Sequence, residues 1–116
     1  MNGPMRSAAG SAVTSDVFRV LADPTRRALF ERLAREGELS VSTLTAAAGV
    51  SQPAVSQHLA ALKGAGLVRD RRHGRITHYR VEPRGLLPLT NWLAVYAAFW
   101  RDKFDNLEAL LNREEL

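Results

Sequence analysis

Glutamine and serine side chains recur over a short stretch near the middle of the chain, at Gln52, Ser56 and Gln57. The apolar residues Val55 and Leu59 lie between and after them at helical spacing. At 100° per residue, Gln57 projects opposite these two residues, and Ser56 lies on a flank. Short uncharged polar groups can hydrogen-bond base edges in a DNA major groove and permit close approach. Gln52, Ser56 and Gln57 are therefore candidate base contacts.

The segment that carries these residues, 40–67, has the pattern of two short helices joined by a tight turn. The first helix is predicted over roughly 41–48, and Gly49 suits its C-terminus because glycine accepts a positive φ. Ser51 can cap the second helix, and Pro53 suits its first turn, where no backbone N–H is needed. The pattern predicts a helix-turn-helix with Ser51 and Pro53 beside the DNA backbone. A packed helical hairpin is the alternative.

A strongly basic β-hairpin is predicted directly after the second helix. Alternating residues over 67–72 and 75–81 flank a His73-Gly74 turn. Five arginines fall within the twelve residues 69–80. We expect Arg71, Arg72 and Arg75 to contact DNA phosphates, which supplies affinity and salt dependence rather than base choice. An ordinary solvated hairpin is the alternative, and it leaves this crowding of arginines unexplained.

The composition indicates one domain whose positive charge is concentrated near this hairpin. The chain has 116 residues and a net charge of +4, and residues 51–84 hold seven of its lysines and arginines against two acidic residues. Such a patch is typical of nucleic-acid binders. No stretch is apolar and long enough to span a bilayer, and the N-terminus lacks a signal-peptide pattern, so we expect a cytoplasmic protein with no membrane partner. The absence of cysteine excludes disulfides and thiolate metal ligands.

The flanking segments complete the predicted domain. Residues 1–14 are rich in glycine, serine and alanine and are predicted to form a disordered tail, which leaves 15–116 as the folded domain. A short helix is expected from residue 15 to residue 22. Another is expected over 24–35, with Asp23 as its cap and Pro24 at its first position. A last helix is predicted over roughly 86–114 from apolar residues that recur every three or four positions.

That last helix is too long for the domain to cover. A chain this small cannot bury an apolar stripe of about 40 Å along its whole length. The economical partner is a second copy of the chain. A ligand pocket lined by the aromatic residues is the alternative, and both can hold if the pocket lies at the dimer seam. The expected dimer-interface residues are Val17, Phe18, Leu89, Trp92, Leu93, Tyr96, Phe99, Trp100 and Phe104.

Four motifs carry a family resemblance that covers about residues 16–111. They are LADPTR at 21–26, SQPAVSQHL at 51–59, AGLV at 65–68, and Gly74-Arg75 with Tyr79. Together they resemble the ArsR/SmtB family of bacterial winged helix-turn-helix repressors. The resemblance implies a mainly α fold with a small β-hairpin, and a homodimer formed through the first and last helices. It also implies an inverted-repeat operator with half-sites one helical turn, roughly 34 Å, apart.

The chain departs from the metal-sensing motifs of that family. The arsenite-type motif reads Glu-Leu-Cys-Val-Cys-Asp-Leu, whereas residues 38–44 read ELSVSTL, with Ser40 and Ser42 in place of both cysteines. Serine oxygens are poor ligands for soft ions. The other common site uses Asp and His on the last helix, and residues 86–116 contain no histidine. We therefore expect no metal site and no cofactor, as in the metal-independent branch of the family.

These features predict a DNA-binding transcriptional repressor whose partners are double-stranded DNA and a second copy of itself. A small-molecule effector is left open by the sequence. The alternative is a winged-helix interaction module whose aromatic last helix binds another protein. No enzyme is expected, because the chain has no cysteine nucleophile, no Gly-rich phosphate loop and no Ser–His–acid grouping that the fold would bring together.

Overall fold

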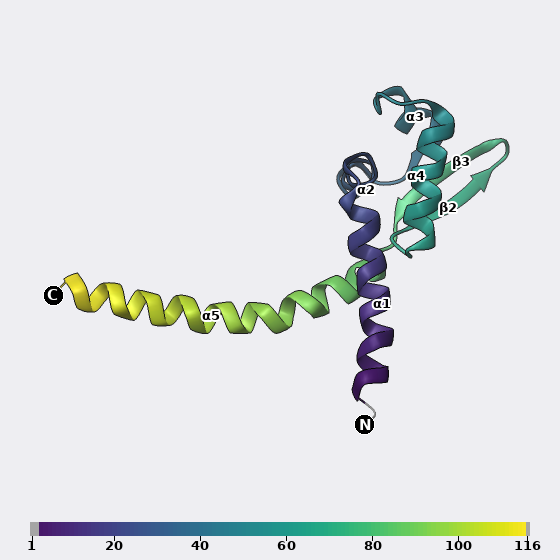
Figure 1. The fold of residues 1–116 in the computed structure, drawn as a ribbon. Coiled ribbons are helices and arrows are strands. Elements are labelled where there is room, and N and C mark those ends of the chain that lie inside the picture. Colours follow the sequence, from purple (N-terminus) through teal and green to yellow (C-terminus); the bar gives the residue numbers. More distant parts are fainter. Residues whose placement is uncertain (1–2, 116) are drawn as a thin grey trace.

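The computed structural model describes the backbone of residues 3–115 and the side chains of residues 12–113, and over this part it is mainly helical. In chain order the elements are α1 (Gly3–Ala22), α2 (Pro24–Glu36), β1 (Leu39–Ser40), α3 (Val41–Ala46), α4 (Gln52–Gly64), β2 (Val68–His73), β3 (Ile76–Val81), the 3-10 turn η1 (Pro83–Leu86) and α5 (Leu87–Glu115). Helices α2, α3 and α4 and the sheet form a head, from which α5 extends as an arm (Figure 1). The predicted fold class is confirmed.

The core of the head is formed where α1, α2 and α4 meet the sheet. Val55, Leu59 and Leu62 of α4 are completely buried, which confirms the stripe expected from helical spacing. The other buried apolar residues are Val17, Val20, Leu29, Phe30, Leu33, Leu44, Leu67 and Val68. Tyr79 and Val81 of β3 pack against this cluster from the sheet. The core therefore holds α4 by one face and leaves its other face free.

Side-chain caps fix where the helices of the head begin. The backbone N–H of Arg26 donates to Asp23 Oδ2 at 2.9 Å, and the Ala54 N–H donates to Ser51 Oγ at 3.3 Å, so both predicted caps are confirmed. Ser40 Oγ accepts from the Thr43 N–H at 3.1 Å and caps α3. This serine occupies a cysteine position of the arsenite-type motif, and here its hydroxyl starts a helix.

The wing is a three-stranded antiparallel sheet in the order β1-β3-β2. Strands β2 and β3 pair from Val68 opposite Val81 to His73 opposite Ile76, so the turn is Gly74-Arg75, one residue later than predicted. Gly74 has a φ of +64°, which suits the first central position of a type II′ turn. Strand β1 was not predicted, because two residues are too few to show an alternating pattern.

Two features of the N-terminal part differ from the sequence pattern, and the domain limits and interface residues stay predictions. Helix α1 begins at Gly3, inside the segment 1–14 for which a disordered tail was predicted. The alanines of this segment favour helix and outweigh the glycine and serine that suggested disorder. Val17, predicted at the dimer interface, is 0% exposed within one protomer and is therefore a core residue. In the described part of the chain, no helix has the length and hydropathy needed to cross a bilayer.

Candidate nucleic-acid interface

The exposed side of α4 carries the predicted base-contacting residues. Gln52, Ser56 and Gln57 are all exposed. Gln57 projects opposite the buried Val55 and Leu59, Ser56 lies on a flank, and Gln52 lies in the first turn of the helix. The buried face of α4 packs against the core, and the Ser51 side-chain cap fixes the first turn of the helix. The helix therefore presents three hydrogen-bonding side chains on a rigid support, together with the exposed Pro53 and Ala60 and no acidic residue.

A groove of about 200 Å³ separates the start of α4 from the wing. It brings together three residues that the sequence singled out from two different elements, namely Gln52 and Ser56 of α4 and Arg75 of the wing turn. The lining residues are Val41, Ser42, Gln52, Ser56, Arg75, Ile76 and Thr77. Hydroxyl, amide and guanidinium groups thus face one space, and these are donors that proteins use toward both bases and phosphates of DNA.

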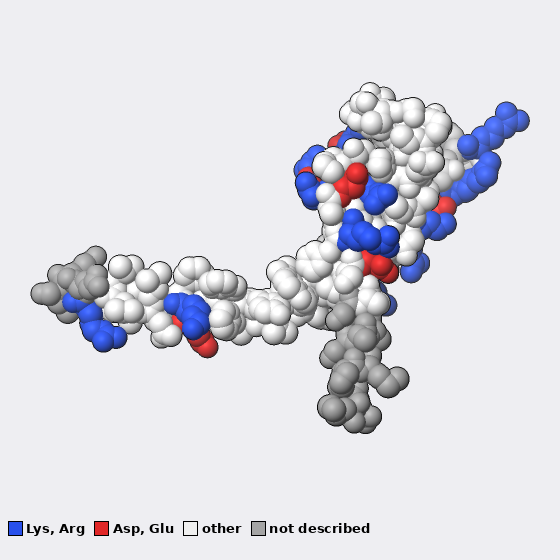
Figure 2. Space-filling model, viewed as in Figure 1, with Lys and Arg blue, Asp and Glu red and all other residues white. Residues whose placement is uncertain are grey.

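The tip of the wing carries accessible positive charge. Figure 2 shows lysine and arginine side chains gathered along the wing and projecting beyond it. Arg72 Nε donates to the carbonyl oxygen of Gly74 at 3.3 Å, and this contact leaves the rest of its guanidinium free for other acceptors. Arg75 lies in the turn itself. Both arginines are exposed at the tip, and their phosphate contacts stay predictions.

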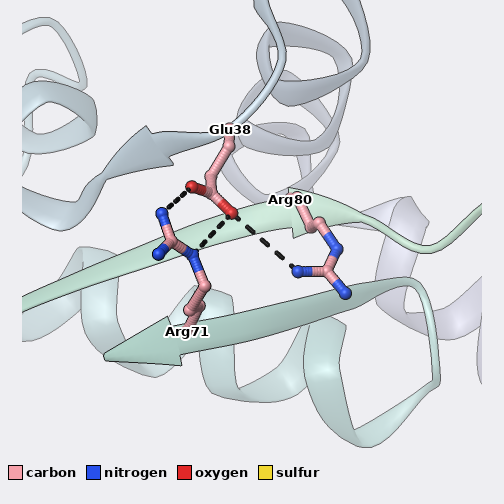
Figure 3. Close-up of polar contacts among 3 residues, drawn as sticks. All are labelled: Glu38, Arg71 and Arg80. Atoms are coloured by element: carbon pink, nitrogen blue, oxygen red, sulfur yellow. Dashed lines mark hydrogen bonds and ion pairs between the residues drawn. The ribbon is translucent and has the colours of Figure 1, made fainter. Parts of the chain in front are cut away.

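Arg71, the third arginine with a predicted phosphate contact, is instead paired within the protein. Arg71 Nη2 lies 2.6 Å from Glu38 Oε2 and its Nε lies 3.4 Å from Oε1, while Arg80 Nη1 lies 3.9 Å from the same carboxylate (Figure 3). The Arg71 guanidinium holds the pKa of Glu38 below its usual value. A phosphate contact stays a prediction for all three arginines, and for Arg71 it requires replacement of this ion pair.

Two further ion pairs reduce the free charge at the base of the wing. Lys63 Nζ lies 3.0 Å from Asp70 Oδ1, a contact that raises the pKa of Lys63 and lowers the pKa of Asp70. Arg69 Nη2 lies 3.5 Å from Glu82 Oε1. The charge counted from the sequence therefore overstates the positive charge available to a ligand, and most of what is available lies at the tip.

Glu38 is the partner of the wing arginines that sequence reasoning missed. It lies 33 positions before Arg71, in the segment leading into β1. Pairing of Leu39 with Tyr79 brings this segment beside the wing. The only signal in the sequence was the excess of arginines in the hairpin over the acidic residues within it, which left the partner unidentified.

His58 of α4 lies near the start of α2. Its Nδ1 is 3.9 Å from Asp23 Oδ2, and its side chain is 22% exposed. Among the described residues, no group of three His, Cys, Asp or Glu side chains could hold a metal ion. The carboxylate that pairs with His58 is the helix cap of α2.

The exposed arm carries most of the predicted dimer-interface residues. Phe18 of α1 and Trp92 of α5 pack edge to face, with ring centroids 5.3 Å apart, at the root of the arm. Farther out, Phe99, Trp100 and Phe104 are 51%, 54% and 62% exposed. Leu89 packs partly against the core, and Leu93 and Tyr96 are exposed. Beyond Trp92, the described rings Phe99, Trp100 and Phe104 contact one another along one helix.

Known proteins of similar sequence are DNA-binding regulators. A helix-turn-helix domain family matches residues 21–71. The arsenical resistance operon repressor of Escherichia coli is 36% identical over 82% of this chain and 79% of its own. An HTH-type transcriptional regulator of Mycobacterium tuberculosis is 43% identical over 84% of this chain and 87% of its own. Against an arsenic resistance regulator of Pseudomonas putida, which is 51% identical, the chain spans about half of the relative's length.

A solved structure with the same fold is the homodimeric winged helix-turn-helix domain of a possible ArsR-family regulator from Mycobacterium bovis. It superposes with a TM-score of 0.65 at 32% identity, and the match covers 80% of this chain and 85% of that one. These relatives are transcriptional regulators and not enzymes, which agrees with the expectation from sequence. The chain therefore belongs to the ArsR/SmtB family of winged helix-turn-helix transcriptional regulators.

Proposed function

We propose that this protein is a sequence-specific transcriptional repressor that binds an inverted-repeat operator as a homodimer and does not sense a metal. The observation that carries the proposal is the exposed face of α4 beside a wing tip that holds Arg72 and Arg75. Gln52, Ser56 and Gln57 would contact base edges in the major groove, where glutamine pairs with adenine through two hydrogen bonds. Ser51, Pro53 and the two tip arginines would lie along the phosphate backbone.

The exposed arm supports the homodimer. Helices α1 and α5 meet at the Phe18–Trp92 contact, so a second copy laid against the arm would be joined through both helices. The Mycobacterium bovis neighbour, which has the same fold, is described as homodimeric. A two-fold axis would place two α4 helices on one side of the dimer, and they can reach successive major grooves if they lie roughly 34 Å apart.

The chemistry of residues 38–44 supports metal independence. Hydroxyl groups stand where arsenite-type sensors have thiolates, and the Ser40 hydroxyl is engaged in capping α3. The Escherichia coli relative is named for arsenical resistance, so arsenite is the ion to test first. Arsenite and Zn²⁺ should each leave operator affinity unchanged. An effector, if the protein has one, would then be an organic molecule or a protein.

The test compares one base contact with one phosphate contact on DNA selected from a random-sequence library. Gln57→Ala should cost about 1–3 kcal/mol of binding free energy, concentrated at one base position. Arg72→Ala should weaken binding to every sequence and reduce the salt slope by about one. Arg113→Ala removes the same charge near the end of α5 and serves as the control, with no expected change. If Gln57→Ala and Arg72→Ala both leave affinity untouched, the reading face is wrongly assigned.

A further inference from the structure

One carboxylate ties two strands of the wing to the segment before the helix-turn-helix. Glu38 accepts two hydrogen bonds from Arg71 of β2, at 2.6 and 3.4 Å, and lies 3.9 Å from Arg80 of β3 (Figure 3). A carboxylate held by the fork of a guanidinium is the same arrangement in which arginine binds a phosphate. Glu38 therefore occupies the groups of Arg71 that a DNA backbone would use.

The strand register explains why these two arginines are available to a carboxylate. Alternate residues of a strand point to opposite faces, and Tyr79 and Val81 point to the core. Arg80, between them on β3, and Arg71, which pairs opposite His78, therefore lie on the outer face of the sheet. Their side chains are about half exposed, at 48% and 51%, whereas that of Glu38 is 28% exposed. Both arginines can thus exchange Glu38 for another anion without disturbing the core.

The pairing divides the basic residues of the wing into two groups. Arg72 and Arg75 at the turn have no acidic partner among the described ion pairs. Arg71 and Arg80, farther from the tip, share one. Every free cation adds to sequence-independent DNA affinity, because each phosphate it neutralises releases condensed counterions. Withholding such cations therefore weakens binding to operator and non-operator DNA alike, because phosphate contacts carry no base information.

We propose that Glu38 stands in for a DNA phosphate on Arg71 and Arg80 and thereby lowers the sequence-independent affinity of the wing for DNA. The inference rests on the proposed DNA-binding function. Under this proposal Arg72 and Arg75 contact DNA phosphates. Arg71 and Arg80 do not, because Glu38 occupies them. The proposal also predicts that loss of an acidic residue tightens binding to DNA that lacks the operator.

The test measures binding to a random-sequence duplex of a few helical turns by fluorescence anisotropy, over a series of salt concentrations. Glu38→Gln should bind several-fold more tightly than the unaltered protein, with a salt slope steeper by up to about 1.8, since each new phosphate contact adds about 0.9. The control, Glu31→Gln, removes the same charge from an exposed residue of α2 whose partner Arg27 is 4.0 Å away. It should give the smaller change expected from net charge alone.

A second set of variants shows whether the arginines cause the gain. In a protein that also carries Arg71→Gln and Arg80→Gln, Glu38→Gln should produce no more than the control shift. Arg71→Gln by itself should leave the salt slope unchanged, in contrast to Arg72→Ala, and this measurement holds even if Glu38→Gln fails to fold.

Each contrary result has a distinct meaning. The inference is overturned if Glu38→Gln binds no better than Glu31→Gln, if its gain survives without the two arginines, or if Arg71→Gln flattens the slope as Arg72→Ala does. Unaltered protein that shows no salt-dependent DNA binding would overturn the proposed function as well.

Discussion

At the scale of single residues, Asp23 shows how one carboxylate connects two helices. It caps α2 by accepting from the Arg26 N–H and lies 3.9 Å from His58 of α4. The Arg26 hydrogen bond, with help from the charges of His58 and Arg26, holds the pKa of Asp23 below the ordinary value of 3.8. A carboxyl whose pKa is lowered by folding stabilises the folded state above its unfolded pKa, and this stabilisation is lost as the pH falls through the folded pKa.

The lowered pKa of Asp23 leads to a prediction for Asp23→Ala. The variant should be less stable than the unaltered protein at neutral pH, and the difference should shrink as the pH falls below about 3.8, where Asp23 becomes protonated. Urea denaturation at a series of pH values measures the difference. Asp23→Asn, which keeps a capping side chain, should lose much less stability at neutral pH. A gap between Asp23→Ala and the unaltered protein that stays constant from pH 7 to acid would contradict the assigned role.

Local and distant residue contacts differed in how well the sequence predicted them. The caps at Asp23 and Ser51 could be predicted because donor and acceptor lie three residues apart. The Glu38–Arg71 pair spans 33 residues and depends on strand register, so no local pattern indicates it. The outward orientation of Gln57 followed from helical periodicity alone, whereas the free charge of the wing depended on which acids fold back onto it.

At the scale of elements, a close contact between two glycines fixes the path from α4 into the wing and out to the arm. Gly66, with a φ of +77°, ends the turn after α4, and Gly85 lies in η1 directly against it. A Cβ on Gly85 would overlap the Gly66 carbonyl oxygen and come within 2.9 Å of Leu67 Cα. Because backbone atoms lie on both sides of the contact, neither segment can yield by rotating a side chain.

Gly85→Ala should therefore destabilise the protein by about 1–3 kcal/mol, the usual cost of overpacking. Gly64→Ala is the matched control, because Gly64 lies in α4 with no atom within 4 Å of its added Cβ and no positive φ. It should be neutral or stabilise the protein by up to about 1 kcal/mol, since alanine favours helix. Thermal and urea unfolding measure both. Equal stability for the two variants would show that the η1 contact does not constrain the fold.

Elements with a long regular pattern were the ones the sequence predicted well. The apolar spacing predicted α4 and α5 nearly to their observed ends, and the alternating, arginine-rich segment predicted the hairpin. The turn is Gly74-Arg75 rather than His73-Gly74 because Gly74 occupies the first central position, which needs a positive φ. The pairing of β2 with β3 sets this position, and composition alone does not reveal it. Strand β1 and the start of α1 lack a periodic signal, and both were missed.

At the scale of the whole molecule, the arm leaves the protomer incomplete. The molecule extends 67 × 44 × 21 Å, far from the shape of a closed domain. Apart from a few charged side chains, the arm shows uncharged surface along its length (Figure 2). Phe99, Trp100 and Phe104 each leave about half of their surface in water. Burying apolar surface is favourable by about 25 cal/mol per Å². Covering the aromatic side chains of the arm with a second protomer would therefore lower the free energy substantially.

Trp100→Glu tests whether the proposed homodimer forms through this stripe. A carboxylate buried in an apolar interface without a partner is strongly destabilising, so the variant should sediment as a monomer while the head stays folded. A monomer presents one α4 helix instead of two. Operator affinity should therefore also fall by about 10²- to 10⁴-fold, because one linked dimer no longer binds both half-sites. Ala98→Glu places the same carboxylate at a neighbouring depth on the opposite face of α5 and should remain dimeric. If Trp100→Glu keeps the dimer mass in analytical ultracentrifugation, the aromatic stripe is not the seam, and a different surface must bring two α4 helices to successive grooves.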